Sequence, residues 1–282
     1  MFNTVAIVGV GLIGGSFSLA LKDKGLVRRV IGVSRSGTTA RKALELGIID
    51  EVLPLEEAVK QSDLIYVAIP VDAMLPVMKN ILDLIAPHQI VADAGSTKYA
   101  LCKFLSDHPA RSRFVATHPM WGTEYSGPEA AMHDAFRGRS CVICEREKSD
   151  PEALALIEKI YTILGMSLVN MEAESHDVHA AYVSHISHIT SFALANTVLE
   201  KEKEEDAIFE LAGGGFESTV RLAKSSASMW APIFMQNREN VLDVLNEHIT
   251  QLRKFKSCLE KENYDYLREL MENANKIGRI LE

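Results

Sequence analysis

The sequence has no long apolar run, no excess of positive charge and few cysteines. Its 282 residues carry a formal net charge of −8, which disfavours binding to nucleic acid or to an anionic membrane surface. No apolar stretch reaches the roughly 18 residues that a membrane-spanning helix needs. The first residues also lack the basic segment of a signal peptide. We therefore expect a cytoplasmic protein without nucleic-acid or membrane partners.

Two of the four cysteines form a Cys-x-x-Cys pair, at Cys141 and Cys144. The neighbouring residues alternate as in a β-strand, where residues three apart point to opposite faces. A redox-active Cys-x-x-Cys instead lies at a helix N-terminus, which stabilises the thiolate. We therefore expect buried, inert thiols, and no metal site.

Short apolar segments alternate with amphipathic helical patterns over residues 1–171. Several segments, such as residues 5–9 and 64–70, are almost wholly apolar, as strands covered on both faces should be. This alternation predicts an α/β fold with a largely parallel, doubly wound sheet. The other expected strands are residues 30–34, 90–94, 114–118, 141–145 and 167–171, and clear helical patterns cover residues 12–24 and 73–85.

No strand pattern is visible over residues 172–282. Residues 241–259 and 264–280 have the apolar spacing of two long amphipathic helices. We expect a second, all-helical domain over residues 172–282, and the chain length also fits about two domains. Wide apolar stripes on such helices are often buried against a second subunit, so a homodimer is expected.

Three glycines form a Gly-x-Gly-x-x-Gly motif between the first expected strand and the first expected helix. In a dinucleotide-binding fold the first glycine permits a tight turn. The second lets the backbone approach the pyrophosphate, and the third allows close helix–strand packing. The helix N-terminus then presents free N–H groups to the phosphates. This predicts a Rossmann-type domain over residues 1–171, with these cofactor-binding residues: Gly9, Gly11, Leu12, Ile13 and Gly14.

Cofactor choice in this fold depends on the end of the second strand, where NAD enzymes usually carry Asp or Glu to bind the ribose hydroxyls. Ser34, Arg35 and Ser36 occupy that region here. No carboxylate is present to repel a 2′-phosphate, and Arg35 can offer it charge-assisted hydrogen bonds. The pattern favours NADP, although stacking of Arg35 over adenine would suit either NADP or NAD.

The ligand crevice of such a fold lies at the carboxyl ends of its strands. His118 ends an expected strand and precedes a turn that contains Pro119 and Gly122. A histidine that titrates near its ordinary pKa of about 6.5 can accept a hydroxyl proton while hydride leaves. His118 is therefore a candidate base, and a purely structural histidine is the alternative interpretation.

Five segments in this order span nearly the whole chain: GVGLIGGS, DAGSTK, THPMWGTEYSG, YVSHISH and GGGFESTVRLAKSSASMW. Together they resemble the TyrA family, the prephenate and arogenate dehydrogenases of tyrosine biosynthesis. A general Rossmann dehydrogenase would share only the first segment. The combination of the last three segments is highly specific.

The resemblance implies roles for individual residues. His118 resembles the catalytic histidine, and Ser96 resembles the serine that hydrogen-bonds this histidine and the substrate hydroxyl. Arg221 resembles the arginine that binds the ring carboxylate. Positions that match the lining of the substrate pocket, together with a nearby aromatic residue, are Thr123, Glu124, His188 and Trp230.

The implied reaction is the oxidative decarboxylation of prephenate to 4-hydroxyphenylpyruvate, with hydride transfer to NAD(P). His118 would accept the hydroxyl proton, and loss of carbon dioxide follows readily because it makes the ring aromatic. Two alternatives remain. One is an arogenate dehydrogenase that forms tyrosine directly. The other is a non-catalytic NADP-binding sensor, which would be expected to have lost at least one of Ser96, His118 and Arg221.

Glu217 lies one helical turn before Arg221, and its role is open. If it faces the substrate pocket, it would attract the ammonium group of arogenate and repel the pyruvyl carboxylate of prephenate. If it lies on the helix surface, it is simply solvated.

Four histidines lie on one expected helix, which raises the question of a metal site. At about 100° per residue, His176 lies opposite His185, and His179 lies opposite His188. The four side chains therefore cannot converge on a metal ion. His185 and His188 share a face of the helix and can point to the crevice together.

Overall fold

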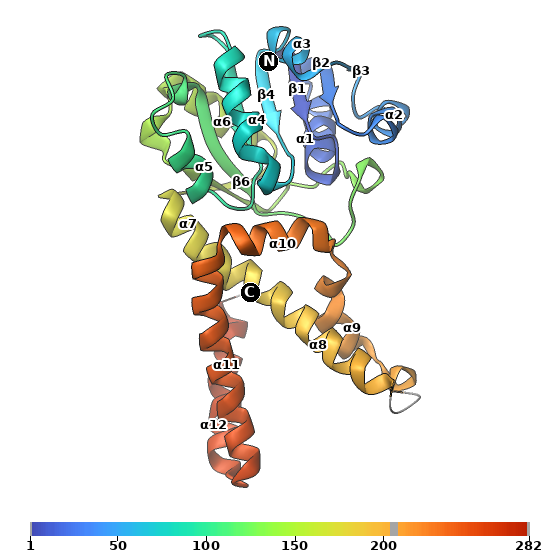
Figure 1. The fold of residues 1–282 in the computed structure, drawn as a ribbon, viewed down its shortest axis with the longest axis vertical. Coiled ribbons are helices and arrows are strands. Elements are labelled where there is room, and N and C mark those ends of the chain that lie inside the picture. Colours follow the sequence, from blue (N-terminus) through green and yellow to red (C-terminus); the bar gives the residue numbers. More distant parts are fainter. Residues whose placement is uncertain (1, 204–207, 281–282) are drawn as a thin grey trace. The chain divides into compact units, whose positions relative to one another are not determined.

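The computed structural model describes residues 2–203 and 208–280 (Figure 1). Within these residues an eight-stranded sheet has the order β3-β2-β1-β4-β5-β6-β7-β8. Its neighbouring strands are parallel, except that β6 and β7 are antiparallel. The expected largely parallel, doubly wound α/β fold is confirmed. The strands are β1 (Phe2–Val8), β2 (Val27–Val33), β3 (Glu51–Val52), β4 (Leu64–Val67), β5 (Ile90–Asp93), β6 (Phe114–Pro119), β7 (Ser140–Cys144) and β8 (Ser167–Met171).

Two features of the sheet were not expected from the sequence. Strand β3 has only two residues, too few to show an alternating pattern. Strand β7 runs antiparallel to β6, and the connection over residues 120–139 contains only the short 3-10 helix η2 (Pro128–Ala130). Parallel neighbours are usually joined through an α-helix, which is absent from this connection.

Helices cover both faces of the sheet (Figure 1). On one face, α1 (Leu12–Asp23) and α6 (Pro151–Ile163) contribute to an apolar cluster that also contains Ile7 of β1. On the other face, α4 (Val71–Leu84) and α5 (Tyr99–Phe104) contribute to a second cluster with Val8. Successive residues of β1 thus enter different clusters, which explains the wholly apolar strand sequences. The helices α2 (Gly37–Glu45) and α3 (Leu55–Lys60) complete this part.

Cys141 and Cys144 lie on opposite faces of β7, one in each apolar cluster. Both are free, buried thiols. Burial raises the pKa of Cys141 to about 12, and it raises the pKa of Cys144 as well. The expectation of inert thiols is confirmed.

A group of helices follows β8. It comprises α7 (Ala173–Ala180), the π-helical turn η4 (Ala181–His185), α8 (Ile186–Glu202), α9 (Gly214–Val220) and α10 (Ala227–Gln236). Helix α10 packs against the start of α4, where Trp230 and Ile233 contact Val71. Gln236 Nε2 donates to the Val71 carbonyl at 3.2 Å, and Thr97 donates a hydrogen bond to Gln236. These contacts attach α10 to the carboxyl edge of the sheet.

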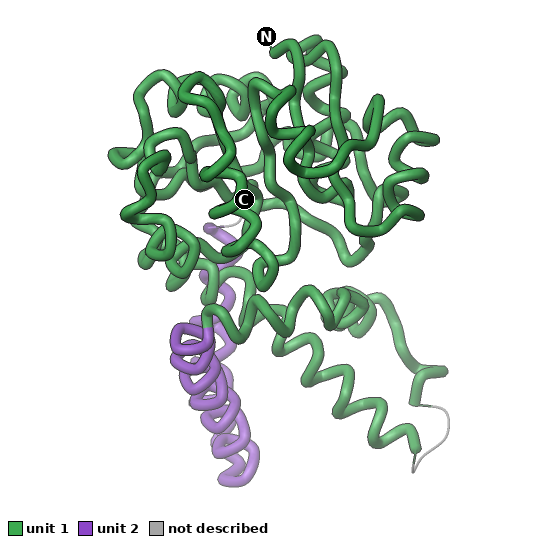
Figure 2. Tube along the Cα trace, turned by 45° about the horizontal axis from the view of Figure 1, so that its top comes forward, with its two compact units in different colours: residues 1–237 green, residues 238–282 purple. Residues whose placement is uncertain are grey.

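The chain divides into two compact units, residues 1–237 and residues 238–282 (Figure 2). The second unit contains α11 (Arg238–Glu260) and α12 (Tyr264–Ala274), followed by the 3-10 helix η7 (Asn275–Arg279). Both long helices were expected, although α12 is shorter than its apolar pattern. Helices α7 to α10 belong to the first unit, so a boundary after residue 171 stays a prediction. No described helix is long and apolar enough to cross a membrane.

Candidate active site

The turn between β1 and α1 is shaped by glycines. Gly9 has φ +96°, and a side chain there would collide with the Ala68 carbonyl. A side chain at Gly14 would collide with the backbone of Gly9. Gly11 instead borders open space and begins α1 without a side-chain cap. Space beside the free N–H groups of the first helical turn, where Leu12 and Ile13 lie, fits a pyrophosphate.

Ser34, Arg35 and Ser36 directly follow β2. Ser34 Oγ accepts a hydrogen bond from the Ser36 amide at 3.3 Å. Ser36 Oγ caps α2 by accepting the Thr39 amide at 3.3 Å. Arg35 is exposed, and no hydrogen bond or ion pair joins its guanidinium to a described residue. The two serines therefore shape the turn, while the Arg35 side chain can reach toward a phosphate.

A buried ion pair joins the ends of β5 and β6. Lys98 pairs with Asp93, and both side chains are 0% exposed. Lys98 Nζ also donates to the Thr117 carbonyl at 2.7 Å, and Asp93 Oδ1 accepts the Thr117 amide at 3.1 Å. The Thr117 hydroxyl lies 2.9 Å from the Tyr161 hydroxyl. This satisfied network holds in place the strand end that carries His118.

His118 contacts a histidine of α7. Its Nδ1 lies 2.8 Å from Nε2 of His176. The side chain is only partly exposed. Burial, followed by electrostatic interactions with His176, Lys98 and His185, lowers the pKa of His118 well below 6.5. The ordinary value expected from the sequence is therefore too high, and the imidazole is neutral and able to accept a proton at physiological pH.

Ser96 lies in the loop between β5 and α5. The family resemblance implies a hydrogen bond between Ser96 and His118, but no such bond is present among the described residues. The partner of His118 Nδ1 is His176 instead. Ser96 is partly exposed.

Arg221 contacts the loop that follows β6. It begins the 3-10 helix η6 (Arg221–Lys224), and its Nη1 donates to Glu124 Oε2 at 2.9 Å. A hydrogen bond from its own backbone amide, and then the Arg221 guanidinium, lower the pKa of Glu124. Thr123 Oγ1 accepts the Tyr125 amide at 3.3 Å. The fold thus brings Arg221 together with the segment of Thr123 and Glu124.

His188 stacks on Trp230, with ring centroids 3.4 Å apart. Its Nδ1 donates a hydrogen bond to the Ser184 carbonyl at 3.1 Å, and burial lowers the pKa of His188. His185 also contacts Trp230, at 6.0 Å between centroids. The expectation that His185 and His188 share a face is confirmed. The buried indole Nε1 of Trp230 has no partner among the described residues, so it can donate to a ligand.

The interpretation of His176 as lying opposite His185 assumed a uniform α-helix, and the structure has the π-helical turn η4 between these residues. A π turn contains more residues than an α turn, so a rotation of 100° per residue does not hold across it. Asn237 Nδ2 donates to the Asp177 carbonyl at 2.7 Å and to His185 Nδ1 at 3.2 Å, so it contacts the segment on both sides of this turn. The relative direction of the two histidines stays a prediction.

Glu217 is exposed, and its Oε1 lies 3.8 Å from Lys224 Nζ. The structure therefore favours a solvated residue on the surface of α9.

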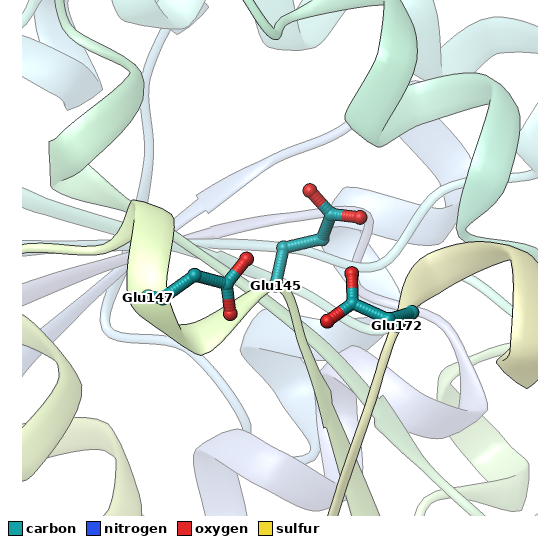
Figure 3. A group of neighbouring side chains, drawn as sticks. All are labelled: Glu145, Glu147 and Glu172. Atoms are coloured by element: carbon teal, nitrogen blue, oxygen red, sulfur yellow. The ribbon is translucent and has the colours of Figure 1, made fainter.

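Among the described residues, one group of side chains has ligand atoms close enough together to hold a metal ion. It consists of Glu145, Glu147 and Glu172 (Figure 3). Their carboxylate oxygens lie within 4.8 Å of one another. Lys148 forms an ion pair with Glu145, and Arg111 interacts electrostatically with Glu145 and Glu147. Cations of the protein thus compensate Glu145 and Glu147, and the group gives no argument for a metal ion.

Two family models match the chain. The nucleotide-binding domain of prephenate dehydrogenase matches residues 17–170, and its dimerization domain matches residues 172–273. The chain belongs to the prephenate dehydrogenase family. The family resemblance carried by the five sequence segments is confirmed, and the protein is a dehydrogenase with a nicotinamide cofactor.

Curated and solved relatives cover almost the whole chain. Prephenate dehydrogenase of Bacillus subtilis is 30% identical over 277 residues, which is 97% of this chain and 75% of the relative. Cyclohexadienyl dehydrogenase of Zymomonas mobilis is 29% identical over 98% of this chain and 95% of its own. The structure of Aquifex aeolicus prephenate dehydrogenase in complex with hydroxyphenyl propionate and NAD+ has a TM-score of 0.91 at 30% identity, covering 100% of this chain and 99% of that one. Synechocystis arogenate dehydrogenase has a TM-score of 0.77 at 26% identity, with 99% and 100% covered.

Four residues around His118 were not identified as site residues from the sequence. Asp93 and Lys98 lie inside the DAGSTK segment, but their mutual pairing is not a pattern that spacing predicts. His176 and Asp177 are neighbours in the sequence, and a histidine beside a carboxylate was the available signal. Their contact with His118 depends on packing between distant segments.

Proposed function

We propose that this protein oxidises and decarboxylates prephenate to 4-hydroxyphenylpyruvate with hydride transfer to NAD(P), a step of tyrosine biosynthesis. The observation that carries the proposal is the neutral His118 at the carboxyl end of β6, beside the Lys98–Asp93 network. The fold supplies the other parts of the site: the glycine turn at Gly9, and Arg221 on the helical segment.

The reaction follows from these groups. The substrate O–H bond breaks and its proton moves to His118, while the hydrogen on the same carbon leaves as hydride, so that a ring carbonyl forms. The bound nicotinamide supplies the hydride acceptor. The bond to the ring carboxylate then breaks, and carbon dioxide leaves as the ring becomes aromatic. The resulting phenolate oxygen takes the proton back from His118, so the base is regenerated.

Arg221 is the proposed anchor of the ring carboxylate. Its guanidinium already binds the Glu124 carboxylate and is half exposed. A planar guanidinium suits a bidentate carboxylate contact. Thr123, Glu124 and His188 are the proposed lining of the substrate pocket, and Ser96 is proposed to contact the substrate hydroxyl.

Prephenate is favoured over arogenate by one observation. Glu217, which could have bound the ammonium group of arogenate, is exposed and lies near Lys224. The decisive measurement is a set of initial rates with prephenate and arogenate, each with NADP and NAD. A higher kcat/KM with arogenate would replace the proposal by the alternative substrate, and no turnover of either would favour the non-catalytic sensor.

His118→Asn tests the base. Asn keeps one hydrogen bond but cannot take the proton, so kcat should fall by roughly 10²–10⁴, the usual range for a lost acid–base group. In the unmodified enzyme kcat/KM should rise with pH through an ionisation below 6.5, because burial lowers the pKa of His118. This acidic limb should disappear in the variant. A slow variant with the same limb would assign the proton to another group, with His188 examined first.

We propose NADP as the preferred cofactor, because Arg35 is exposed beside the turn that follows β2. Gly9, Gly11, Leu12, Ile13 and Gly14 would hold the pyrophosphate, and Ser34 and Ser36 would shape the 2′-phosphate subsite. Arg35→Ala should raise KM for NADP by roughly 10- to 150-fold, the equivalent of about 1.5–3 kcal/mol for a charged hydrogen bond. KM for NAD should change little. A better kcat/KM with NAD in the unmodified enzyme would contradict the preference.

We further propose that residues 1–171 bind the cofactor, and that residues 172–282 complete the substrate site and form a homodimer. The match of residues 172–273 to a dimerization domain supports the second part. Sedimentation at micromolar concentration should show a dimer, and a monomer would contradict it. The proposed location is the cytoplasm.

A further inference from the structure

A line of hydrogen bonds runs from His118 into α7. His118 Nδ1 lies 2.8 Å from His176 Nε2, and His176 Nδ1 lies 2.8 Å from Asp177 Oδ1. His176 is 2% exposed and Asp177 is 3% exposed. The line is therefore shielded from water, and the position of each proton on it is set by the protein.

Asp177 determines which atom donates in each hydrogen bond of this line. Its Oδ1 also accepts the Lys98 amide at 2.7 Å, and its Oδ2 accepts the Tyr99 amide at 3.0 Å. The backbone amides of Lys98 and Tyr99 thus occupy both oxygens, and the Asp177 carboxylate is the acceptor in each of these bonds. The proton shared with His176 must therefore be on Nδ1 of His176.

The next bond follows from the first. When Nδ1 carries the single proton of the His176 ring, Nε2 has a lone pair, and Nδ1 of His118 donates to it. The neutral His118 ring then carries no proton on Nε2. No described residue forms a hydrogen bond with that atom.

We propose that His176 and Asp177 are positioning residues that hold His118 in the tautomer whose Nε2 is free to take the proton of the substrate hydroxyl. This inference rests on the proposed function for its catalytic meaning. Without Asp177, the ring of His176 can place its proton on Nε2 and donate to His118. His118 would then carry its own proton on Nε2 and could not act as a base.

The same line stabilises the product of proton transfer. When Nε2 of His118 has taken the proton, its Nδ1–H still points to His176, and the positive charge lies two hydrogen bonds from the Asp177 carboxylate. The other charged or titratable groups near His118 do not supply this counter-charge. Lys98 is a cation paired with Asp93, and His185 is held by Asn237.

Tautomers can be measured without substrate by ¹⁵N NMR of histidine-labelled protein, with assignment by single His→Gln variants. Near neutral pH, His118 and His176 should each show a protonated Nδ1 and an unprotonated Nε2. In Asp177→Asn, the Nε2-protonated form of His118 should become populated. A protonated Nε2 of His118 in the unmodified protein would overturn the proposal.

Kinetics supply the second readout. Asp177→Asn should lower kcat with prephenate roughly 10²-fold, because the wrong tautomer removes the base, while KM stays nearly unchanged. Asp23→Asn is the matched control, since Asp23 also accepts from a histidine, His133 at 2.7 Å, in an exposed pair. It should leave kcat unchanged.

Asp177→Asn removes an acceptor from α5 and can destabilise the fold, so His176 is tested as well. His176→Phe leaves both amide contacts of Asp177 in place but removes the acceptor for His118. His176→Gln offers a carbonyl oxygen in its place. We expect a large loss of kcat with Phe and a partial rescue with Gln. Equal kcat in both variants would overturn the proposal. A further outcome is that the unmodified protein and its variants all fail to turn over prephenate while NMR shows the expected tautomers of His118 and His176. That result would contradict the proposed function but support the proposed arrangement of protons.

Discussion

Two ion pairs near His118 and Arg221 differ in their exposure to solvent. The Asp93–Lys98 pair is 0% exposed on both sides and joins the ends of two strands. The Glu124–Arg221 pair joins a loop to a helical segment, and the Arg221 side chain is 50% exposed. In the first pair every charge is neutralised and hydrogen-bonded inside the protein. In the second pair the Arg221 guanidinium keeps contact with water, as its proposed role in binding the substrate carboxylate requires.

The difference shows how burial divides roles among similar side chains. A buried charge that loses its partner destabilises the fold strongly, because no water replaces the partner. An exposed pair contributes little to stability, so its members remain available for binding. The buried pair therefore supports the strand end that carries His118, and the Glu124–Arg221 pair, in which Arg221 is half exposed, is the proposed binding element. The expected effects of breaking them differ in size and in kind.

The largest effect should follow from Lys98→Met, which leaves the Asp93 carboxylate buried without its cation. We expect the free energy of unfolding to fall by about 3–5 kcal/mol, the usual loss when one member of a buried pair is removed. Urea denaturation followed by circular dichroism measures it. The double variant Lys98→Met with Asp93→Asn should recover part of the loss. An equal loss in both would show that packing of the lysine stem, and not the unpaired charge, is responsible.

Arg221→Ala should act on binding and not on folding. KM for prephenate should rise by roughly 10- to 150-fold, equivalent to about 1.5–3 kcal/mol for a charged hydrogen bond. Cofactor affinity, measured by fluorescence titration, should stay nearly unchanged, because the glycine turn is untouched. Equal losses of both affinities would mean that Arg221 supports the fold instead of contacting the substrate.

His185 extends the comparison to a buried group that stays neutral. Burial lowers its pKa to about 4, whereas an unfolded chain protonates histidine near 6.5. Below pH 6.5 the unfolded state therefore binds more protons, and stability is lost as the pH falls toward 4. At pH 5 the loss from this group should be about 2 kcal/mol. Denaturation of His185→Gln beside the unmodified protein, at pH 7 and pH 5, checks it: the variant should show a correspondingly weaker decline.

The smallest effect should come from Glu124→Gln. Because Arg221 is half exposed, the free energy of unfolding should change by less than about 1 kcal/mol. The same denaturation experiment as for Lys98→Met measures it. A loss as large as that of Lys98→Met would remove the distinction between scaffold and binding element.

Local features of this protein were predictable from the chain alone. The strands of the doubly wound sheet have apolar sequences because both faces are covered, and this requirement is visible without coordinates. The turn at Gly9 has a local requirement for glycine in its positive φ, although the neighbours that also exclude a side chain there, Ala68 and Ile69, come from a distant part of the chain. Strand β3 was not predictable, because two residues are too few to show an alternating pattern. The direction of β7 was not predictable either, because the sequence of a long loop does not indicate whether the next strand is parallel or antiparallel.

The nucleotide turn, the alternation of the longer strands with helices, the family and the candidate residues His118, Ser96 and Arg221 follow from the amino-acid sequence, because each depends on neighbouring residues or on a specific motif. The side chain that His118 contacts depends on tertiary packing. Its partner His176 lies 58 positions away, on α7. That contact, the buried Asp93–Lys98 pair and the lowered pKa of His118 all arise from packing, which brings distant groups together and removes water from around them.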